Sequence, residues 1–378
     1  MKQTFLMLAA ISGALLTGCS NEEIASVDNL SQNAIGFHVV GNAAETRATP
    51  ITPSNLETET DFDVFAYTAD GTAFMGKADE IMGHSGVKIK HNGENWDYAD
   101  QNDVHYWPTE SLDFYAISPG SYSINYMIHY AWSFNHNSQQ IHYSCMDEYG
   151  TGEGKHADHD VMYGIAKNRT KDMNNGVVKF TFKHILSQVV FKAKTELATM
   201  NVVINGIEIY NAKMGGTFTL PSDAETTPTA ADNWELSADG LYSPTVIRNA
   251  AIEVKSNTEA TDISSTTPIF TIPQTLTAWD VKGAKKTKAE ADAAKQSYLE
   301  IFCKIQQSGV YLHGSAENYA TIYVPFGASW EPGKRYIYTL IFGGGYDADG
   351  NAILKPIEFD AETTDWVDDP TMWLSCNL

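Results

Sequence analysis

Many short apolar runs, separated by Gly, Pro, Asn and Asp, are the feature that most restricts the fold of this chain. Runs of ~4–8 residues rich in Val, Ile, Thr, Tyr and Phe are typical of β-strands. In residues 62–67 a period of two separates two faces, with Phe62, Val64 and Ala66 on one and Asp63, Phe65 and Tyr67 on the other. Further strands are predicted at 35–40, 112–117, 177–182, 189–193, 202–204 with 207–210, 217–220, 298–305, 320–324 and 336–342.

Helical patterns are scarce in the same sequence. Residues 285–295 are rich in Ala, Lys, Glu and Asp, and their only apolar side is alanine, which predicts an exposed loop helix. Residues 184–187 are expected to form one turn between two strands, and 221–233 a long surface loop. Many short strands with few helices predict an all-β chain built from β-sandwiches.

Composition restricts the number of domains and the partners. A chain of 378 residues with 43% hydrophobic residues suits two domains better than one. The formal net charge is −22, and removing residues 1–18 takes away only Lys2, which gives −23. Because such a chain repels phosphate groups, nucleic acid is excluded as an expected partner. No pattern calls for a cofactor.

The first residues have the plan of a bacterial lipoprotein signal. Lys2 precedes a largely apolar run at 5–16, and Leu16-Thr17-Gly18-Cys19 follows. We expect residues 1–18 to be a signal peptide, Cys19 to be lipidated, and 19–33 to be a polar tether. The apolar run is too short to span a bilayer. Cys145, Cys303 and Cys376 then remain, with no metal-ligand spacing, and we expect at least two of them to be buried thiols.

Several segments, taken in order, resemble the fimbrillin family of Bacteroidetes surface lipoproteins, the pilin-like proteins of type V pili. Each segment alone is weak evidence for this family, but the order of the segments is fairly specific to it. They are 35–37 before Thr46-Arg47-Ala48, then 62–67, Tyr106-Trp107-Pro108, 112–116, 160–164, 178–189, Ile272-Pro273-Gln274, 330–338 and Asp365-Trp366.

The resemblance implies two transthyretin-like β-sandwich domains in tandem, at 34–194 and 195–378, with residues 180–191 closing the first. It also implies a route of assembly. The lipid delivers the precursor to the outer membrane and the cell surface. An Arg-specific extracellular protease cuts after the first strand, and a strand from another pilus subunit fills the groove that opens.

The residues themselves are compatible with this route. A strand at 35–40 followed by a polar, proline-containing stretch is how a removable edge strand would be built. Arg47 is the first arginine of the chain and is followed by Ala48. Its alternative interpretation is an ordinary solvated loop residue. We expect processing between Arg47 and Ala48.

Histidines and aromatic residues gather between 122 and 160. The histidines are His129, His136, His142, His156 and His159, and Asp158 and Asp160 flank the last. They lack the fixed spacing of a zinc motif, so a polar insertion is favoured over a metal site. Exposed aromatics in such an insertion can pack on sugar rings. The candidate ligand-binding side chains are Tyr130, Trp132 and Phe134.

Two other patterns have simpler interpretations than chemistry. Residues 347–351 fit neither register of an EF-hand loop, and Asp349-Gly350 predicts a turn between two strands. His184 has no nucleophile elbow or orienting acid in its sequence, and we expect a buried histidine satisfied by backbone carbonyls. No active site is defined, and the chain is not expected to be an enzyme.

Two functions from different classes stay open. The first is a fimbrial subunit or a tip or accessory adhesin assembled by strand exchange. The alternative is an uncleaved surface lipoprotein that binds host glycans or proteins through aromatic loops. Pro370 and the charges of Asp365, Asp368 and Asp369 interrupt the alternation that a C-terminal donor strand would need. This favours an accessory or tip subunit over a main stalk pilin.

Overall fold

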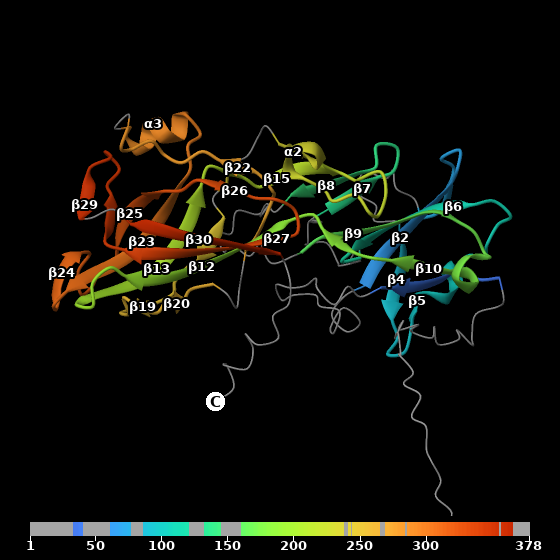
Figure 1. Ribbon diagram of the computed structural model, residues 1–378, viewed down its shortest axis with the longest axis horizontal. Coiled ribbons are helices and arrows are strands. Elements are labelled where there is room, and N and C mark those ends of the chain that lie inside the picture. Colours follow the sequence, from blue (N-terminus) through green and yellow to red (C-terminus); the bar gives the residue numbers. More distant parts are fainter. Residues whose placement is uncertain are drawn as a thin grey trace, which may run out of the picture.

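The computed structural model describes residues 33–40, 61–76, 86–120, 132–144, 160–237, 241–242, 244–264, 269–283, 286–354 and 357–365. These residues form an elongated, strand-rich molecule (Figure 1). The helices among them are short: η1 (Gln101–Asp103), η2 (Met173–Gly176), α2 (Ala230–Asn233) and α3 (Lys288–Ala293). The prediction of an all-β chain is confirmed. None of the described helices is long and apolar enough to cross a membrane.

The first sandwich is centred on a seven-stranded sheet, counted within the described ranges. Its path is β11 (Lys183–His184), β9 (Met162–Arg169), β6 (Leu112–Ser118), β2 (Asp61–Thr68), β4 (Val87–His91) and β5 (Trp96–Tyr98), and β3 (Ala73–Met75) pairs with β2. The predicted alternation in β2 is confirmed, and both of its faces are covered. Phe62 packs in one core, and Phe65 packs in another on the opposite face.

Two smaller sheets cover these faces. The first pairs β1 (Gly36–Val39) with β10 (Val177–Phe180) in parallel, and Phe37 and Phe180 pack in the same core as Phe62. The second has the order β16 (Trp234–Leu236), β15 (Gly215–Thr219), β8 (Gln140–Ser144) and β7 (Trp132–Asn135). Phe218 and Trp234 from this sheet pack in the core that contains Phe65.

The second sandwich encloses a separate, larger core. Within the described ranges, one sheet runs β20 (Thr261–Asp262), β12 (Ser187–Thr195), β27 (Lys334–Phe342), β30 (Glu358–Asp365), with β21 (Ile269–Thr271) on β12. The facing sheet runs β18 (Thr245–Ile247), β13 (Met200–Tyr210), β23 (Tyr298–Gln307), β25 (Ala320–Pro325), β28 (Gly344–Tyr346), β29 (Ala352–Leu354), with β19 (Ile252–Val254) on β13 and β24 (Val310–His313) on β23. Their inward residues, among them Phe191 and Ile301, form one cluster together with Trp330, which precedes β27.

The chain passes between the two sandwiches more than once. β12 pairs in parallel with β27 over eight residue pairs, so residues 187–195 belong to the second sandwich and do not close the first. Conversely, β15, which follows residue 195, pairs with β8, and β16 pairs with the other edge of β15. Short pairs β14 (Ala212–Lys213) with β17 (Leu241–Tyr242) and β22 (Thr275–Leu276) with β26 (Ala328–Ser329) complete the described strands. A division into tandem domains at 194/195 remains a prediction.

Candidate functional site

The first strand is the feature of the first sandwich with the clearest functional potential. β1 runs parallel to β10, with Gly36 opposite Val177 and Val39 opposite Phe180, and the Val40 amide donates to the Phe180 carbonyl at 2.8 Å. Parallel neighbours require a long crossover connection. Here β1 lies far from β10 in sequence, and the chain between them forms most of the seven-stranded sheet. β1 is therefore added to the sandwich as a short separate segment.

The residues directly before β1 contact residues 105–107. The Ile35 amide donates to the His105 carbonyl at 2.9 Å, and the Trp107 amide donates to the Asn33 carbonyl at 2.9 Å. The Tyr98 hydroxyl donates to the Ile35 carbonyl at 3.0 Å. Burial raises the pKa of Tyr98, so this hydroxyl keeps its proton and stays a donor at neutral pH. β1 is thus paired with β10, and the residues directly before it are hydrogen-bonded to Tyr98, His105 and Trp107.

Phe37 anchors β1 in an aromatic groove. Its side chain is 5% exposed, and its ring centroid lies 5.6 Å from that of Tyr98, 6.4 Å from Phe180 and 6.5 Å from Phe114. Burying a side chain of this size stabilises the fold by about 1.5–3 kcal/mol. If β1 left, the three rings and the edge of β10 would face solvent, which is a template for another apolar strand.

Trp107 fixes the end of the groove where β10 begins. Its indole Nε1 donates to the Gly176 carbonyl at 3.0 Å. Gly176 has φ of +80°, and a Cβ there would lie 3.1 Å from that Nε1, so glycine is required for both reasons. The tryptophan belongs to the Tyr106-Trp107-Pro108 motif, but the sequence alone assigned it no role. The groove therefore has a rigid wall that does not depend on β1.

The expected processing and lipidation residues, Cys19, Arg47 and Ala48, lie outside the described residues. Arg47 falls in the segment that joins β1 to β2. The other three arginines of the chain are held in or beside strands. Arg169 ends β9, Arg335 lies in β27, and Arg248 follows β18 and pairs with Glu208 at 2.7 Å.

The aromatic side chains proposed for ligand binding do not all have the predicted exposure. The predicted exposure of Phe134 is wrong. This residue is 5% exposed, and its ring packs against those of Phe65 and Tyr115 at centroid distances of 5.0 and 5.7 Å. Strand alternation in β7 turns its ring into the core between the two sheets. Trp132 begins β7, and its side chain is outside the described set, as is Tyr130. A role for these two in binding glycans remains a prediction.

The described histidines of this region contact different partners. His136 stacks on Tyr67, and His142 contacts the Thr217 hydroxyl at 2.8 Å. His129, His156, His159 and Asp158 lie outside the described residues. The part of the chain that is described holds no group of three or more His, Cys, Asp or Glu side chains suited to a metal ion.

His184 is expected from the sequence to be a buried histidine. It is buried, as predicted, and its Nδ1 lies 2.6 Å from the Asp160 carboxylate, so one partner of the ring is a buried acid that was not predicted from the sequence. Asp160 precedes β9 and His184 lies in β11, which pairs with β9. Nothing in the local sequence of either residue indicates the other.

Two smaller predictions concern the cysteines and a turn. Cys303 is a fully buried thiol, and burial raises its pKa, whereas Cys145 and Cys376 lie outside the described residues, so the burial of at least two cysteines stays a prediction. The predicted turn is confirmed. Residues 347–351 form a turn between β28 and β29, and the Asp347 carboxylate accepts from the amides of Asp349 and Asn351 at 3.0 and 2.8 Å. Bonds within the loop therefore account for this carboxylate.

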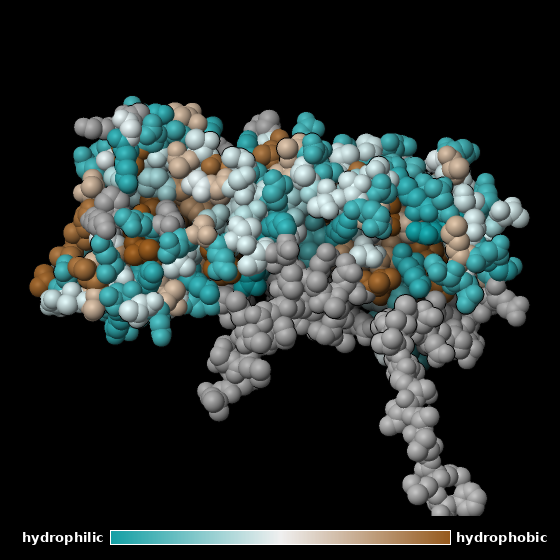
Figure 2. Space-filling model, in the orientation of Figure 1, coloured by the Kyte–Doolittle hydropathy of each residue, from teal (hydrophilic) through white to brown (hydrophobic). Residues whose placement is uncertain are grey.

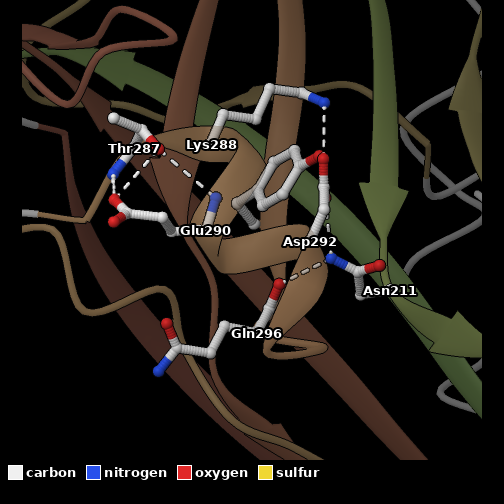
Figure 3. A network of polar contacts seen from close by, with 7 residues as sticks. Asn211, Thr287, Lys288, Glu290, Asp292 and Gln296 are labelled. Carbon is white, nitrogen blue, oxygen red and sulfur yellow. Dashed lines mark hydrogen bonds and ion pairs between the residues drawn. The ribbon is translucent and has the colours of Figure 1, made fainter.

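A second cluster joins α3 to the outer face of the eight-stranded sheet (Figure 3). Asp292 accepts from the Tyr298 hydroxyl at 2.7 Å, from Lys288 Nζ at 3.0 Å and from Asn211 Nδ2 at 3.1 Å. The Lys288 ammonium also lies 5.2 to 5.7 Å from the ring centroids of three tyrosines, namely Tyr210, Tyr298 and Tyr323. The helix predicted at 285–295 therefore packs on the sheet, and Ala291 is fully buried.

The capping box of α3 is a sequence pattern from which the start of this helix could have been predicted. Thr287 Oγ1 accepts from the Glu290 amide at 3.3 Å, and Glu290 Oε2 accepts from the Thr287 amide at 2.8 Å. This Thr-x-x-Glu pattern fixes the start of the helix. It places Lys288 and Asp292 one turn apart on the same face of the helix. The cluster is an ordered structural contact between α3 and the sheet.

We expect Asp292→Asn to destabilise the chain by about 1 kcal/mol at pH 7, because it weakens three hydrogen bonds to a partly exposed charge. Burial alone would raise the pKa of Asp292, but the bonds from Tyr298, Lys288 and Asn211 outweigh it and lower the pKa below 3.8. This stabilisation is present above the unfolded pKa and is lost as pH falls through the lower folded value. Urea titrations should show the difference between variant and wild type at pH 5 to 7 and its decline below pH 4. A difference that stays constant to pH 3 would contradict this origin.

The fold and the groove define a β-sandwich protein whose first strand closes an apolar groove. The family model described as "Fimbrillin-like" matches residues 46–366, and the chain belongs to that family. The structure is similar to a crystal structure of a fimbrial protein from Bacteroides vulgatus ATCC 8482, with a TM-score of 0.56 and 16% identity over 88% of this chain and 99% of that one.

A second similar structure is a putative cell adhesion protein from Bacteroides uniformis ATCC 8492. Its TM-score is 0.47, with 13% identity over 88% of this chain and 98% of that one. No curated protein matches the chain in sequence. At 16% identity the structure of the Bacteroides vulgatus protein supports the fold alone, and the family assignment depends on the sequence match over residues 46–366.

Proposed function

We propose that this chain is a structural, non-catalytic fimbrial subunit or a tip or accessory adhesin. In this proposal it is exported as a precursor lipidated at Cys19, reaches the outer membrane and the cell surface, and is cut after Arg47 by an Arg-specific extracellular protease. Other pilus subunits then supply a strand to the groove that β1 vacates. Membership of the fimbrillin-like family supports this function.

The observation that carries the proposal is the way in which β1 is held. It is a four-residue strand near the start of the described fold, paired with one neighbouring strand, β10, and anchored by one large aromatic side chain. The groove that receives Phe37 is formed by residues of β5, β6 and β10, which belong to the rest of the sandwich. A different strand with an aromatic residue at the same register could fill it.

The distribution of arginine supports the cleavage step. The chain has four arginines, and those at 169, 248 and 335 lie in or beside strands that pair with neighbours. A protease must bind its substrate in an extended form, so bonds held in a sheet are poor substrates. Cleavage after Arg47 would separate β1 from β2 without breaking any strand of the seven-stranded sheet.

The experiment that tests this proposal is limited digestion of the native chain with an Arg-specific protease, followed by intact-mass spectrometry. We expect one cut, a new N-terminus at Ala48, and a fragment ending at Arg47 that stays bound until it is displaced. A synthetic peptide covering residues 33–40 should bind the processed protein and compete with the retained fragment. Arg47→Lys is the matched control, because it keeps the charge and removes the specificity. Cutting at Arg169, Arg248 or Arg335 in the native state, or resistance at Arg47, would contradict the proposal.

A further inference from the structure

A lysine lies between two buried aspartates at the start of β2 in the first sandwich. Asp61 and Asp63 are 5% and 0% exposed. Lys88 of the neighbouring strand β4 is the direct partner of Asp63 in the sheet. Its Nζ lies 3.3 Å from Asp63 Oδ1 and 3.4 Å from Asp61 Oδ2. The visible face of this sandwich is largely hydrophilic (Figure 2), so the burial of these three charged groups is unusual and costs desolvation free energy.

Two glycines leave the room that this cluster occupies. A Cβ at Gly120 would lie 2.6 Å from Asp61 Oδ1 and 2.7 Å from Asp63 Oδ1, and it would lie 2.7 Å from Lys88 Nζ as well. The Gly120 amide donates to the Asp61 carbonyl at 2.9 Å, which holds the chain after β6 against the cluster. A Cβ at Gly86 would lie 2.5 Å from the Asp63 Cβ. The three polar groups therefore converge on one point, enclosed by backbone without side chains.

This arrangement brings an amine against a carboxyl group in a partly dry site. The 3.3 Å approach of Lys88 Nζ to an oxygen of Asp63 presents the nitrogen to the carboxyl group whose carbon it would attack. Groups of one chain held in such an orientation react as if at effective concentrations of about 10⁵–10⁸ M. Transfer of a proton from the ammonium to the carboxylate removes both buried charges and leaves a nucleophilic amine beside a neutral acid.

We propose that Lys88 and Asp63 condense to an isopeptide bond that joins β4 to β2. The ammonium first passes one proton to the Asp63 carboxylate. Nζ then attacks Cγ, and the Nζ–Cγ bond forms while Asp61 accepts a second proton from the nitrogen. Asp61 returns this proton to the hydroxyl on Cγ, the bond from Cγ to that oxygen breaks, and water leaves. One ammonium and one carboxylate thus become one amide and one water, with no oxidant or other reactant.

The exposure of the neighbouring groups assigns these roles. Lys90 Nζ lies 3.8 Å from Asp61 Oδ2, and its side chain is 57% exposed, whereas that of Lys88 is 25% exposed. Because water stabilises an exposed ammonium, Lys90 keeps its charge and favours the ionised form of Asp61. Asp61 is therefore the carboxylate that accepts and returns a proton. Asp63, which has no exposed surface, is the carboxyl group that is attacked.

The bond would enclose residues 63–88 in a covalent ring and attach β2 to β4, which lie side by side in the sheet (Figure 1). It forms in the folded chain and needs no cleavage, so it goes beyond the function proposed above. Its consequence for assembly does depend on that function. After a cut behind Arg47, β2 is the first of the described strands in the processed chain. A covalent link to β4 would keep this strand from peeling off its sheet when a pilus is pulled.

The experiment is intact-mass spectrometry of the denatured chain from residue 19 onward, with Cys19→Ser to remove the lipid. We expect a mass lower than that of the sequence by one water molecule. Trypsin should release residues 48–77 and 78–90 as one joined peptide, because the amide links Asp63 to Lys88 and protects the bond after Lys88 from the protease. A chain at the full mass of its sequence, or a water lost from other residues, would overturn the proposal.

Three variants test the assigned roles. Lys88→Arg keeps the positive charge without the reactive amine and should have the full mass of its sequence. Lys90→Arg is the matched control, the same change on the same strand, and should still lose one water. Asp61→Asn should slow the reaction by about 100-fold, measured in samples taken at intervals after synthesis.

Each variant also has an outcome that contradicts the proposal. These outcomes are a water lost in Lys88→Arg, the full mass in Lys90→Arg, or an unchanged rate in Asp61→Asn. Circular dichroism equal to that of the parent establishes that a variant is folded, and the joined peptide of the parent chain decides the proposal even if one is not. None of these readouts involves the cut after Arg47, so failure here is distinct from failure of the proposed function.

Discussion

Amide hydrogen exchange of β1 is expected to accelerate by about 100-fold or more when Phe37 is replaced by alanine. A buried Phe→Ala change costs about 3–5 kcal/mol, and each 1.4 kcal/mol corresponds to a factor of ten in an equilibrium constant. The cost falls on β1, since Phe37 is its deepest aromatic contact, with Tyr98, Phe114 and Phe180 around it. The informative amides are those of Ile35 and Val40, which donate to His105 and Phe180.

The matched control is Phe191→Ala in the second core. Phe191 is fully buried and lies 5.5 Å from Tyr338, so its loss should destabilise the second sandwich by a similar amount. The amides of β1 should keep their exchange rates in that variant if β1 opens as a separate unit. Acceleration below tenfold in Phe37→Ala would show that the groove does not hold β1 through this side chain. Equal acceleration throughout the seven-stranded sheet would show that β1 cannot leave without unfolding its sandwich.

A separable β1 is the physical requirement for strand exchange. The Phe37→Ala variant should therefore also exchange faster with a peptide of residues 33–40 after processing at Arg47. The family match and the fold are independent of this result, because neither depends on the energy with which β1 is held. If the variant does not exchange faster with the peptide, the alternative function, an uncleaved surface lipoprotein, is favoured.

Strand positions were predictable because they depend on local pattern. Residues 112–117 and 336–342 alternate or stay apolar over a full strand, and both correspond to observed strands, β6 and β27. The predicted pair 202–204 and 207–210 is one strand, β13. A shift of register between Ile204 and Gly206 accommodates an extra residue, and such a bulge breaks the alternation without ending the strand.

The partners of strands were not predictable in the same way. Residues 187–195 carry a strand pattern, but nothing in it states that β12 pairs with β27, which is far away in sequence. The same holds for β15, which lies beyond the predicted boundary and pairs with β8. Pairing depends on the complementary burial of both strands, and a single strand's pattern reports only its own faces.

The prediction of side-chain exposure in the aromatic site was wrong for a related reason. The polar residues around Phe134 predict an exposed aromatic in a loop, whereas Phe134 lies in β7 with its ring in the core. A four-residue strand with one apolar face does not give enough alternation to be recognised. The exposure of the hairpin residues 310–312 was not predicted either, because apolar residues in a strand are normally expected in the core.

The buried pair of Asp160 and His184 leads to the second large expected effect. Asp160→Ala should lower the free energy of unfolding of the first sandwich by about 3–5 kcal/mol. The two residues are each 5% exposed, and removing one partner leaves the other buried without this bond. Equilibrium urea unfolding, followed by the near-ultraviolet signal of the aromatic cores, measures the change.

A double-mutant cycle separates the pair from simple loss of packing. His184→Ala alone should cost a similar amount, but adding it to Asp160→Ala should cost much less than in the wild type, because the bond is already gone. Additive losses would mean that each residue acts through other contacts and that the 2.6 Å approach contributes little. β11 leads within three residues into β12. If the pair is strongly coupled, breaking its bond should therefore also loosen the segment that connects the two sandwiches. The amides of Ile185 and Gly333, which donate to the Val161 and Leu186 carbonyls at 3.0 and 2.9 Å, should then exchange faster in both single variants.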